Sequence, residues 1–275
     1  MLPVYRSRPL PGRILAAMAD FSSIIVSDSH LGAAPAARER AFHDFLRFAG
    51  ESTDDLVING DLFDFWFEYR TVILRRHFGT LRLLADMVDG GTRVRLVGGN
   101  HDFWGGAFLR EEMGIELIDG PVITDIGGRR TYLAHGDGLG AGDLGYRVLR
   151  RIIRSRPARA AFRLVHPDWT AGLIRRVSRT ESRHDQPDAG RTRAAALAAH
   201  ARELLEEDAT IDLVAFGHSH IPELVEVEPG RHYLNTGDWV HHCTWASVDA
   251  GGVELHEWSE EDRLNRAIRL GARPV

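Results

Sequence analysis

The chain contains the stretch Leu56-Val57-Ile58-Asn59-Gly60-Asp61-Leu62-Phe63-Asp64. Its first part, Leu56–Asn59, is short, apolar and β-branched, which is typical of a strand buried on both faces. Gly60 allows a tight turn at the end of this run, and a carboxylate, Asp61, follows at once. Open α/β sheets bind their ligands beyond the carboxyl ends of their strands. The stretch therefore predicts a layered α/β core with a polar site at one sheet edge.

The same pattern continues along the chain, with strands and helices alternating in the first half and strands joined by short turns in the last third. Further strands are expected at Ile24–Ser27, Val94–Gly98, Thr131–Ala134, Leu213–Phe216, Glu223–Val227, His232–Asn235, Trp245–Val248 and Val253–Leu255. Helical segments are expected at Ala36–Gly50, Arg70–Gly90 and Phe108–Met113. Residues 138–210 read as helical, with breaks at Pro157, Pro167 and Pro187.

These patterns predict one core domain with a helical insertion. The expected parts are an N-terminal arm (1–19), a core (20–137 and 211–260), the insertion (138–210) and a C-terminal tail (261–275). No apolar run approaches the roughly 18 residues of a membrane span. Residues 1–17 lack the continuous apolar stretch of a secretory signal. The single cysteine excludes an intramolecular disulfide and fits a reducing compartment, so we expect a cytoplasmic protein.

The overall charge bears on the choice of partners. The 275-residue chain has a formal net charge of −5, and all of its basic side chains other than histidine are arginine. A negative total argues against general nucleic-acid binding, so no nucleic-acid partner is expected. Arginine side chains are well suited to bidentate hydrogen bonding with phosphate groups.

Five short polar motifs occur in order, each where a predicted strand ends. They are Asp28-Ser29-His30, Gly60-Asp61, Gly99-Asn100-His101-Asp102, His135-Gly136-Asp137 and Gly217-His218-Ser219-His220. Any one of them alone is usually a turn. Because strand ends meet at one edge of a sheet, five such clusters in one chain predict a single site.

The residue types of these motifs predict a metal centre. Aspartate, asparagine and histidine without cysteine suit Mn²⁺, Fe²⁺, Co²⁺ or Zn²⁺ rather than a thiolate zinc site. Asp28 and His30, like His218 and His220, are two residues apart, a spacing that points both side chains to one face of extended backbone. Seven candidate ligands are too many for one tetrahedral ion. They suit two divalent ions, Mn²⁺ being the first choice, about 3.5–4 Å apart with a shared carboxylate.

The order D-x-H, G-D-x-x-D, G-N-H-D, H-G-D and G-H-x-H resembles that of the calcineurin-like metallophosphoesterase superfamily, over roughly residues 23–240. The resemblance implies a four-layer α/β/β/α fold, a β-sandwich flanked by helices, with the site at one edge. It implies a first metal held by Asp28, His30, Asp61 and His220, and a second held by Asp61, Asn100, His135 and His218. A hydroxide bridging the two metals would attack phosphorus in line.

The resemblance also assigns two residues beside the metals. His101, which follows the ligand asparagine, would stabilise the phosphoryl oxygens or protonate the leaving group. Asp64, three residues after the bridging carboxylate, would orient His101; the alternative is a solvated turn residue. Asp102 and Asp137 read as turn residues or as groups that support the ligands.

Longer matches narrow the family. Gly60–Trp66 (GDLFDFW), Gly99–Trp104 (GNHDFW) and Asn235–Trp239 (NTGDW) resemble the UDP-2,3-diacylglucosamine hydrolase family and its near relatives. Those enzymes cleave a pyrophosphate in lipid A synthesis, giving UMP and 2,3-diacylglucosamine 1-phosphate. A helical insertion between their fourth and fifth motifs caps the site and holds the acyl chains. The resemblance implies this reaction and a nucleotide-linked glycolipid substrate here.

Two other functions stay open at this point. In the well-characterised branch of that family an arginine follows the ligand asparagine, where this chain has His101. A phosphodiesterase or phosphatase acting on another nucleotide or phosphoester is therefore one alternative. A non-catalytic, phosphate-sensing scaffold is the other, and the intact set of seven ligands argues against it.

The predicted insertion is strongly basic. Arg147–Arg179 contains ten arginines and one acidic residue, interleaved with apolar side chains. Basic amphipathic helices bind anionic headgroups and membrane surfaces, and guanidinium groups pair with pyrophosphate. We expect a cap that contacts the anionic surface of the inner membrane; the alternative is a solvated basic face. The arginines expected to bind substrate are Arg147, Arg150, Arg151 and Arg154.

Overall fold

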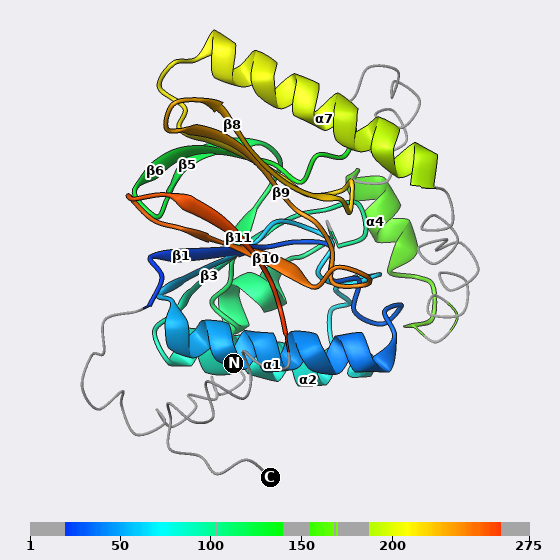
Figure 1. Cartoon of the computed structure of the whole chain (residues 1–275). Coiled ribbons are helices and arrows are strands. Elements are labelled where there is room, and N and C mark those ends of the chain that lie inside the picture. The colour runs from blue at the N-terminus through cyan, green and yellow to red at the C-terminus, as the bar shows by residue number, and fades with distance from the viewer. Residues whose placement is uncertain (1–19, 103, 140–154, 168, 170–186, 260–275) are drawn as a thin grey trace.

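The computed structural model describes residues 20–102, 104–139, 155–167, 169 and 187–259. Two β-sheets stack face to face, with helices α1 (Ala36–Ser52) and α2 (Phe78–Asp89) covering one outer face and α7 (Pro187–Glu207) covering the other (Figure 1). The predicted four-layer α/β/β/α fold is confirmed.

The first sheet contains six strands. In spatial order they are β11 (Val253–Glu257), β10 (Thr244–Val248), β1 (Ser23–Val26), β2 (Asp55–Ile58), β3 (Arg93–Val97) and β4 (Glu116–Ile118). Strands β1 to β4 are parallel, whereas β10 and β11 run antiparallel. Their inner residues, such as Ile25, Val57 and Val97, are fully buried between the sheets.

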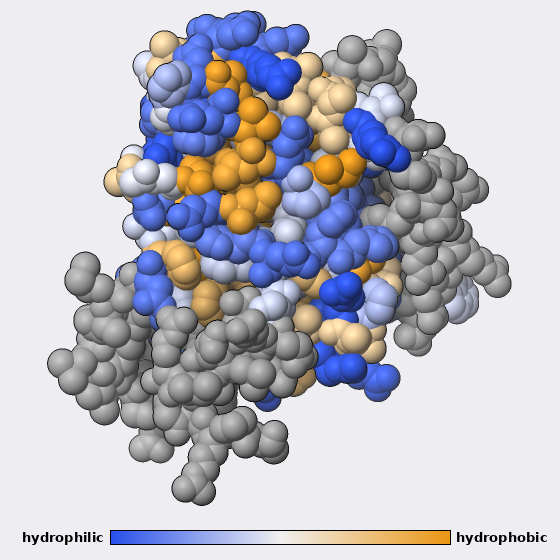
Figure 2. All heavy atoms as spheres, viewed as in Figure 1, coloured by the Kyte–Doolittle hydropathy of each residue, from blue (hydrophilic) through white to orange (hydrophobic). Residues whose placement is uncertain are grey.

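The second sheet contains five strands. In spatial order they are β5 (Val122–Ile126), β6 (Arg129–Leu133), β7 (Leu213–Phe216), β9 (Arg231–Thr236) and β8 (Pro222–Glu228). Strands β6, β7 and β9 are parallel, so their carboxyl ends meet at one edge. Apolar side chains gather over the outer strand β8 on the face shown in Figure 2, among charged ones. The glutamates of β8 fit the way in which exposed sheet edges avoid pairing with other chains.

Three features differ from the sequence-based expectation. Strands β4 and β5 were not predicted, because β4 has only three residues and β5 carries Thr124 and Asp125 on a half-exposed edge. The helix expected at Arg70–Gly90 begins only at Phe78, after a 3₁₀ turn at Arg75–His77. The β-branched run Thr71-Val72-Ile73 disfavours a helix at that point.

Within the stretch 138–210, two helices are described, α4 (Arg156–Phe162) and α7. Helix α7 buries Leu197, Ala201 and Leu205 against Val214 and Phe216 of β7. It is thus the fourth layer of the sandwich, although the sequence placed it in the insertion. Pro187 stands at its first position, where a proline is well accommodated.

The other predicted parts are only partly covered. The arm (1–19) and the tail (261–275) lie outside the described residues, so these two expectations remain predictions. No helix in the described ranges combines the length and the apolar character that crossing a bilayer requires.

Arg95 on β3 links the two sheets. Its Nε donates to Asp55 Oδ1 of β2 at 2.9 Å, its Nη2 pairs with the second oxygen of the same carboxylate, and its Nη1 donates to the carbonyl of Asp125 in β5 at 3.0 Å. The Arg95 side chain is buried, so its charge depends on these partners.

We predict that Arg95→Ala lowers the free energy of unfolding by about 3–5 kcal/mol, because it removes the cation that pairs with Asp55 and leaves that carboxylate only the hydrogen bond from Ser23 Oγ. Chemical denaturation measures the loss. Arg93→Ala, on the same strand, is the control: Arg93 pairs with Glu116 on the surface, and its loss is expected to cost at most about 1 kcal/mol. Equal losses in the two variants would contradict the structural role of Arg95.

Candidate metal centre

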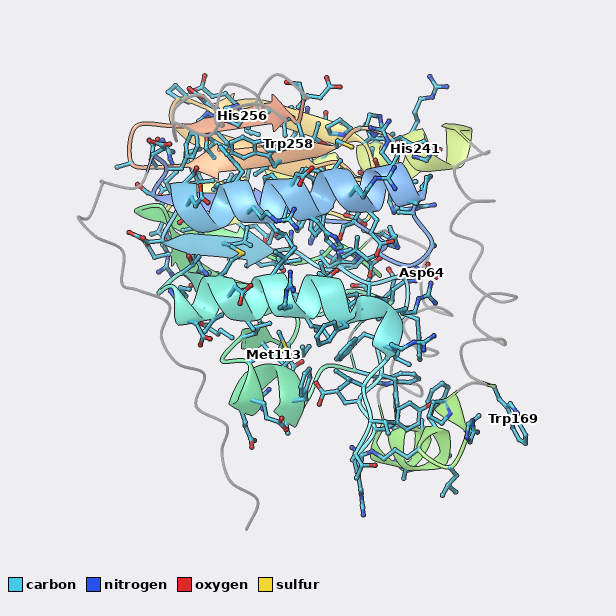
Figure 3. All side chains as sticks on the ribbon, turned by 90° about the horizontal axis from the view of Figure 1, so that it is seen from below. Asp64, Met113, Trp169, His241, His256 and Trp258 are labelled. Atoms are coloured by element: carbon cyan, nitrogen blue, oxygen red, sulfur yellow. The ribbon has the colours of Figure 1, made fainter. Side chains whose placement is uncertain are left out.

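The five motifs converge where β1, β2, β3, β6 and β7 end. Beyond the strands, their loops stay hydrogen-bonded to one another: Asp28 N donates to Gly60 O at 3.1 Å, and His30 N donates to Asp61 O at 2.9 Å. Trp66 N similarly donates to His101 O at 3.2 Å. Asp64 and His241, labelled in Figure 3, mark this end of the molecule. The convergence predicted from the sequence is thus present.

Among the described residues, three groups of side chains present ligand atoms within 4.8 Å of one another. Two consist of predicted ligands: Asp28, His30 and His220, and Asp61, His135 and His218. The third combines His30 with Asp64 and His101, the two residues expected beside the metals. The Asp61 carboxylate lies between the first two groups, because its Oδ2 is 3.2 Å from His135 Nε2 and 3.8 Å from His30 Nε2. This is the arrangement in which one carboxylate can serve two cations.

The site contains buried polar atoms that a cation would satisfy. Asp28 Oδ1, Asn100 Oδ1 and His135 Nε2 are buried without a hydrogen-bond partner. An unsatisfied buried polar atom is costly, so these atoms indicate a ligand. His135 Nδ1 donates to the carbonyl of Asn59 at 2.8 Å, which leaves Nε2 as the coordinating atom. The residues present therefore fit divalent metal ions.

Burial and close charges perturb the titration of the ligands. Burial raises the pKa of Asp28 and lowers the pKa values of His30 and His218 well below normal. For Asp61, burial acts to raise the pKa, but His135 and its neighbours outweigh it and hold the pKa well below normal. His30 and His218 are thus held in the neutral form that metal binding needs. For His135 and His220, burial acts to lower the pKa, but the carboxylates of Asp61 and Asp28 outweigh it and raise the pKa of each ring.

Most of the ligands have an unusual backbone conformation. Positive φ angles of 42° to 65° occur at Asp28, His30, Asp61, His218 and His220. The extended backbone predicted for the pairs Asp28/His30 and His218/His220 is therefore wrong. Both residues of each pair adopt a left-handed conformation instead. Such conformations are uncommon for residues with side chains, and they cluster where function requires strain.

Two glycines allow the ligand loops to touch. A Cβ on Gly99 would lie 2.1 Å from Asp61 Oδ1, and one on Gly60 would lie 2.3 Å from His135 Nδ1. Both distances are far below van der Waals contact. These glycines therefore admit the ligand side chains, in agreement with the close approach expected from the sequence.

His101 lies beside the first cluster, and its ring packs edge-on against His30 at a centroid distance of 4.8 Å. Its Nδ1 donates to the backbone carbonyl of Asp64 at 2.7 Å, whereas the Asp64 carboxylate is 3.6 Å away. The closer partner of His101 is thus the Asp64 backbone rather than its side chain. The Asp64 carboxylate also lies 4.0 Å from His30 Nδ1.

Three side chains support the ligands, and two of them, Asn59 and Asp238, were not singled out from the sequence. Asp102, which we read as a turn or supporting residue, accepts hydrogen bonds from the backbone N–H groups of Gly99, Asp61, Leu62 and Phe63 at 2.7–3.3 Å. Asn59 donates to the carbonyls of Ala134 and Ala215 in the other sheet. Asp238 Oδ2 lies 3.3 Å from His220 Nδ1. The sequence does carry a signal for Asn59, because an amide directly after an apolar strand, as in Val57-Ile58-Asn59, indicates a buried hydrogen-bonding residue.

Helix α4, within the predicted insertion, packs against aromatic residues that follow the second and third motifs. The ring of Phe162 lies 4.6 Å from Phe67 and 4.8 Å from Trp104, centroid to centroid. A pocket of about 290 Å³ adjoins these rings, with Arg70 and Arg163 in its lining. The arginines expected to bind substrate, at positions 147, 150, 151 and 154, lie outside the described residues.

We predict that Gly99→Ala weakens metal binding at least tenfold, because the added methyl group displaces Asp61. Calorimetric titration of the metal-free protein with Mn²⁺ measures the affinity. Gly252→Ala is the matched control, since a Cβ there meets nothing within 4 Å. Unchanged affinity in Gly99→Ala would mean that Asp61 is not a ligand.

Comparison of the sequence with known proteins also indicates a metal-dependent phosphoesterase. The model of the calcineurin-like phosphoesterase family matches residues 21–222. UDP-2,3-diacylglucosamine hydrolase of Ralstonia nicotianae is 33% identical over 222 residues, covering 78% of this chain and 82% of that protein. The enzyme of the same name from Porphyromonas gingivalis is 29% identical over 254 residues, covering 86% and 96%.

Solved structures are more distant. Vps29 of Chaetomium thermophilum matches 88% of this chain and 91% of its own, with a TM-score of 0.43 and 13% identity. The family model covers most of this chain, from just before β1 to the first residue of β8. All five motifs lie within the matched range. On these grounds the chain belongs to the calcineurin-like phosphoesterase family.

Proposed function

We propose that the protein hydrolyses the pyrophosphate bond of UDP-2,3-diacylglucosamine to UMP and 2,3-diacylglucosamine 1-phosphate. The observation that carries the proposal is the likeness to hydrolases of that name over most of both chains. The two ligand groups joined by Asp61 support the metal-dependent chemistry that such a cleavage needs.

Two divalent ions would be held by the ligands already described. Asp28, His30 and His220 would hold the first and Asn100, His135 and His218 the second, with Asp61 shared. When bound, such ions lower the pKa of water and neutralise charge on the phosphoryl oxygens. Mn²⁺ is our first choice, with Fe²⁺, Co²⁺ and Zn²⁺ as alternatives that the same ligand types suit.

His101 is proposed as the catalytic acid or phosphoryl-stabilising group. The hydrogen bond to the Asp64 carbonyl fixes Nδ1 as the protonated nitrogen, so Nε2 is the atom that exchanges a proton with the substrate. Its side chain is 18% exposed, so solvent and substrate can reach it. Asp64 acts as its positioning residue.

The cap is proposed to hold the lipid part of the substrate at the inner membrane surface. Leu164 and Trp169, just after α4, are 89% and 74% exposed, and Trp169 extends away from the body of the protein (Figure 3). Exposed apolar side chains next to arginines suit the interface of an anionic bilayer. Arg147, Arg150, Arg151 and Arg154 are proposed to pair with the substrate phosphates.

The proposed activity predicts UMP release. Purified protein with Mn²⁺ and UDP-2,3-diacylglucosamine should form UMP and the lipid phosphate in equal amounts, as measured by chromatography. Asp61→Ala is the inactive control. Absence of UMP with each of the four metals would refute the substrate, and faster turnover of another nucleotide or phosphoester would establish the alternative enzyme.

His101→Ala should keep its metals and lose on the order of 10²-fold in turnover, as expected for removal of a general acid. Turnover is followed by UMP release, and metal content by plasma emission. His200→Ala on α7 should behave like the unaltered enzyme. A metal content that falls together with activity would make His101 a ligand instead, and unchanged turnover would remove it from the reaction.

A further inference from the structure

A buried carboxylate at the rim of the first ligand group contacts three histidines. Asp238 Oδ2 lies 3.3 Å from His220 Nδ1 and 3.3 Å from His241 Nδ1, and Asp238 Oδ1 lies 3.2 Å from His242 Nδ1. Asp238 Oδ1 also accepts the backbone N–H groups of His241 and His242 at 2.9 and 3.0 Å. One carboxylate thus joins an interior metal ligand to two neighbouring imidazoles.

Those two imidazoles face outward. The side chains of His241 and His242 are 50% and 45% exposed, whereas Asp238 is fully buried. The hydrogen bond to Asp238 raises the pKa of His242, because it favours the protonated ring. The result is a rim of two exposed imidazoles, one carboxylate away from the candidate ligand His220.

The loop that carries the pair is held firmly in place. The Trp239 ring is buried against α1, and the backbone N–H of Trp239 donates to the carbonyl of Asp28 at 3.1 Å. Arg38 of α1 donates to the carbonyl of His241 at 3.2 Å and to Cys243 Sγ at 3.1 Å. The loop is thus bonded directly to the first metal motif, and the imidazoles keep a defined position beside it.

We propose that His241 and His242 form a subsite for the second phosphoryl group of a diphosphate ester. The two phosphorus atoms of a diphosphate share one bridging oxygen, so when the metals hold one phosphoryl group the other must lie at the rim of the site. Cationic side chains there form strong, charge-assisted hydrogen bonds to phosphate oxygens. The subsite rests on the proposed function, and it predicts a preference for diphosphates over simple diesters.

The reaction that the subsite would assist is hydrolysis of the bond between phosphorus and the bridging oxygen. The oxygen of a water molecule would bond to one phosphorus of the diphosphate, and the bond from that phosphorus to the bridging oxygen would break; ions held by the ligand groups would lower the pKa of that water. The second phosphoryl group leaves with the bridging oxygen as a phosphate monoester. The protons of the water pass to solvent or to the product phosphates. His241 and His242 bind the group that accumulates negative charge as it leaves.

The test compares two substrates in the metal-loaded full-length enzyme. We expect His241→Gln/His242→Gln to lower kcat/KM for UDP-2,3-diacylglucosamine at least tenfold, and for bis(p-nitrophenyl) phosphate, which has no second phosphoryl group, less than twofold. His200→Gln is the control, and metal content is measured in every variant. Equal losses on both substrates, or no loss on the diphosphate, would overturn the subsite.

A second measurement does not depend on the proposed lipid substrate. UDP and UMP are compared as inhibitors of bis(p-nitrophenyl) phosphate hydrolysis. The double variant should weaken inhibition by UDP at least tenfold and inhibition by UMP less than twofold. Equal weakening or no weakening would refute the subsite even if the lipid proves not to be the substrate. The single variants are measured in the same way if the double variant loses metal.

Discussion

The Asp61 carboxylate lies 3.2 Å from His135 on one side and 3.8 Å from His30 on the other. Its second oxygen accepts the backbone N–H of His101 at 3.0 Å. A charged group in this buried position is costly unless opposite charges and donors surround it. The two sheets, the glycine at position 99 and the Asp102 carboxylate that binds the neighbouring N–H groups all serve to keep it there.

The architecture around that carboxylate follows from parallel strands. Strands β1, β2 and β3 of one sheet and β6, β7 and β9 of the other direct their carboxyl ends to the same edge, so side chains from six separate stretches meet. Asn59 then bonds across from one sheet to the other. The site thus lies on the seam between the sheets, and its geometry depends on how they stack.

Nine of the eleven strands described, and the meeting of the five motifs at one edge, could be predicted from the sequence, because short β-branched runs ending in polar residues carry a strong local signal. The backbone conformations and hydrogen bonds that position the candidate ligands could not be predicted from the sequence. The left-handed conformation of Asp28 and His218 depends on tertiary contacts that override local preference, and the role of the Asp64 backbone carbonyl has no side-chain signature. Helix α7 was placed in the insertion because its apolar positions do not reveal which surface they cover.

The rim differs in kind from the interior of the site. Inside, burial lowers the pKa values of His30 and His218 and so favours the neutral form that metal binding needs, whereas neighbouring carboxylates raise the pKa values of His135 and His220. At the rim, the hydrogen bond to Asp238 raises the pKa of His242, because it favours the protonated ring. One residue type therefore serves two tasks in adjacent places. The titration of each ring depends on burial and on the carboxylates beside it, and Asp238 connects the two places because it contacts His220 in the interior and His242 at the rim.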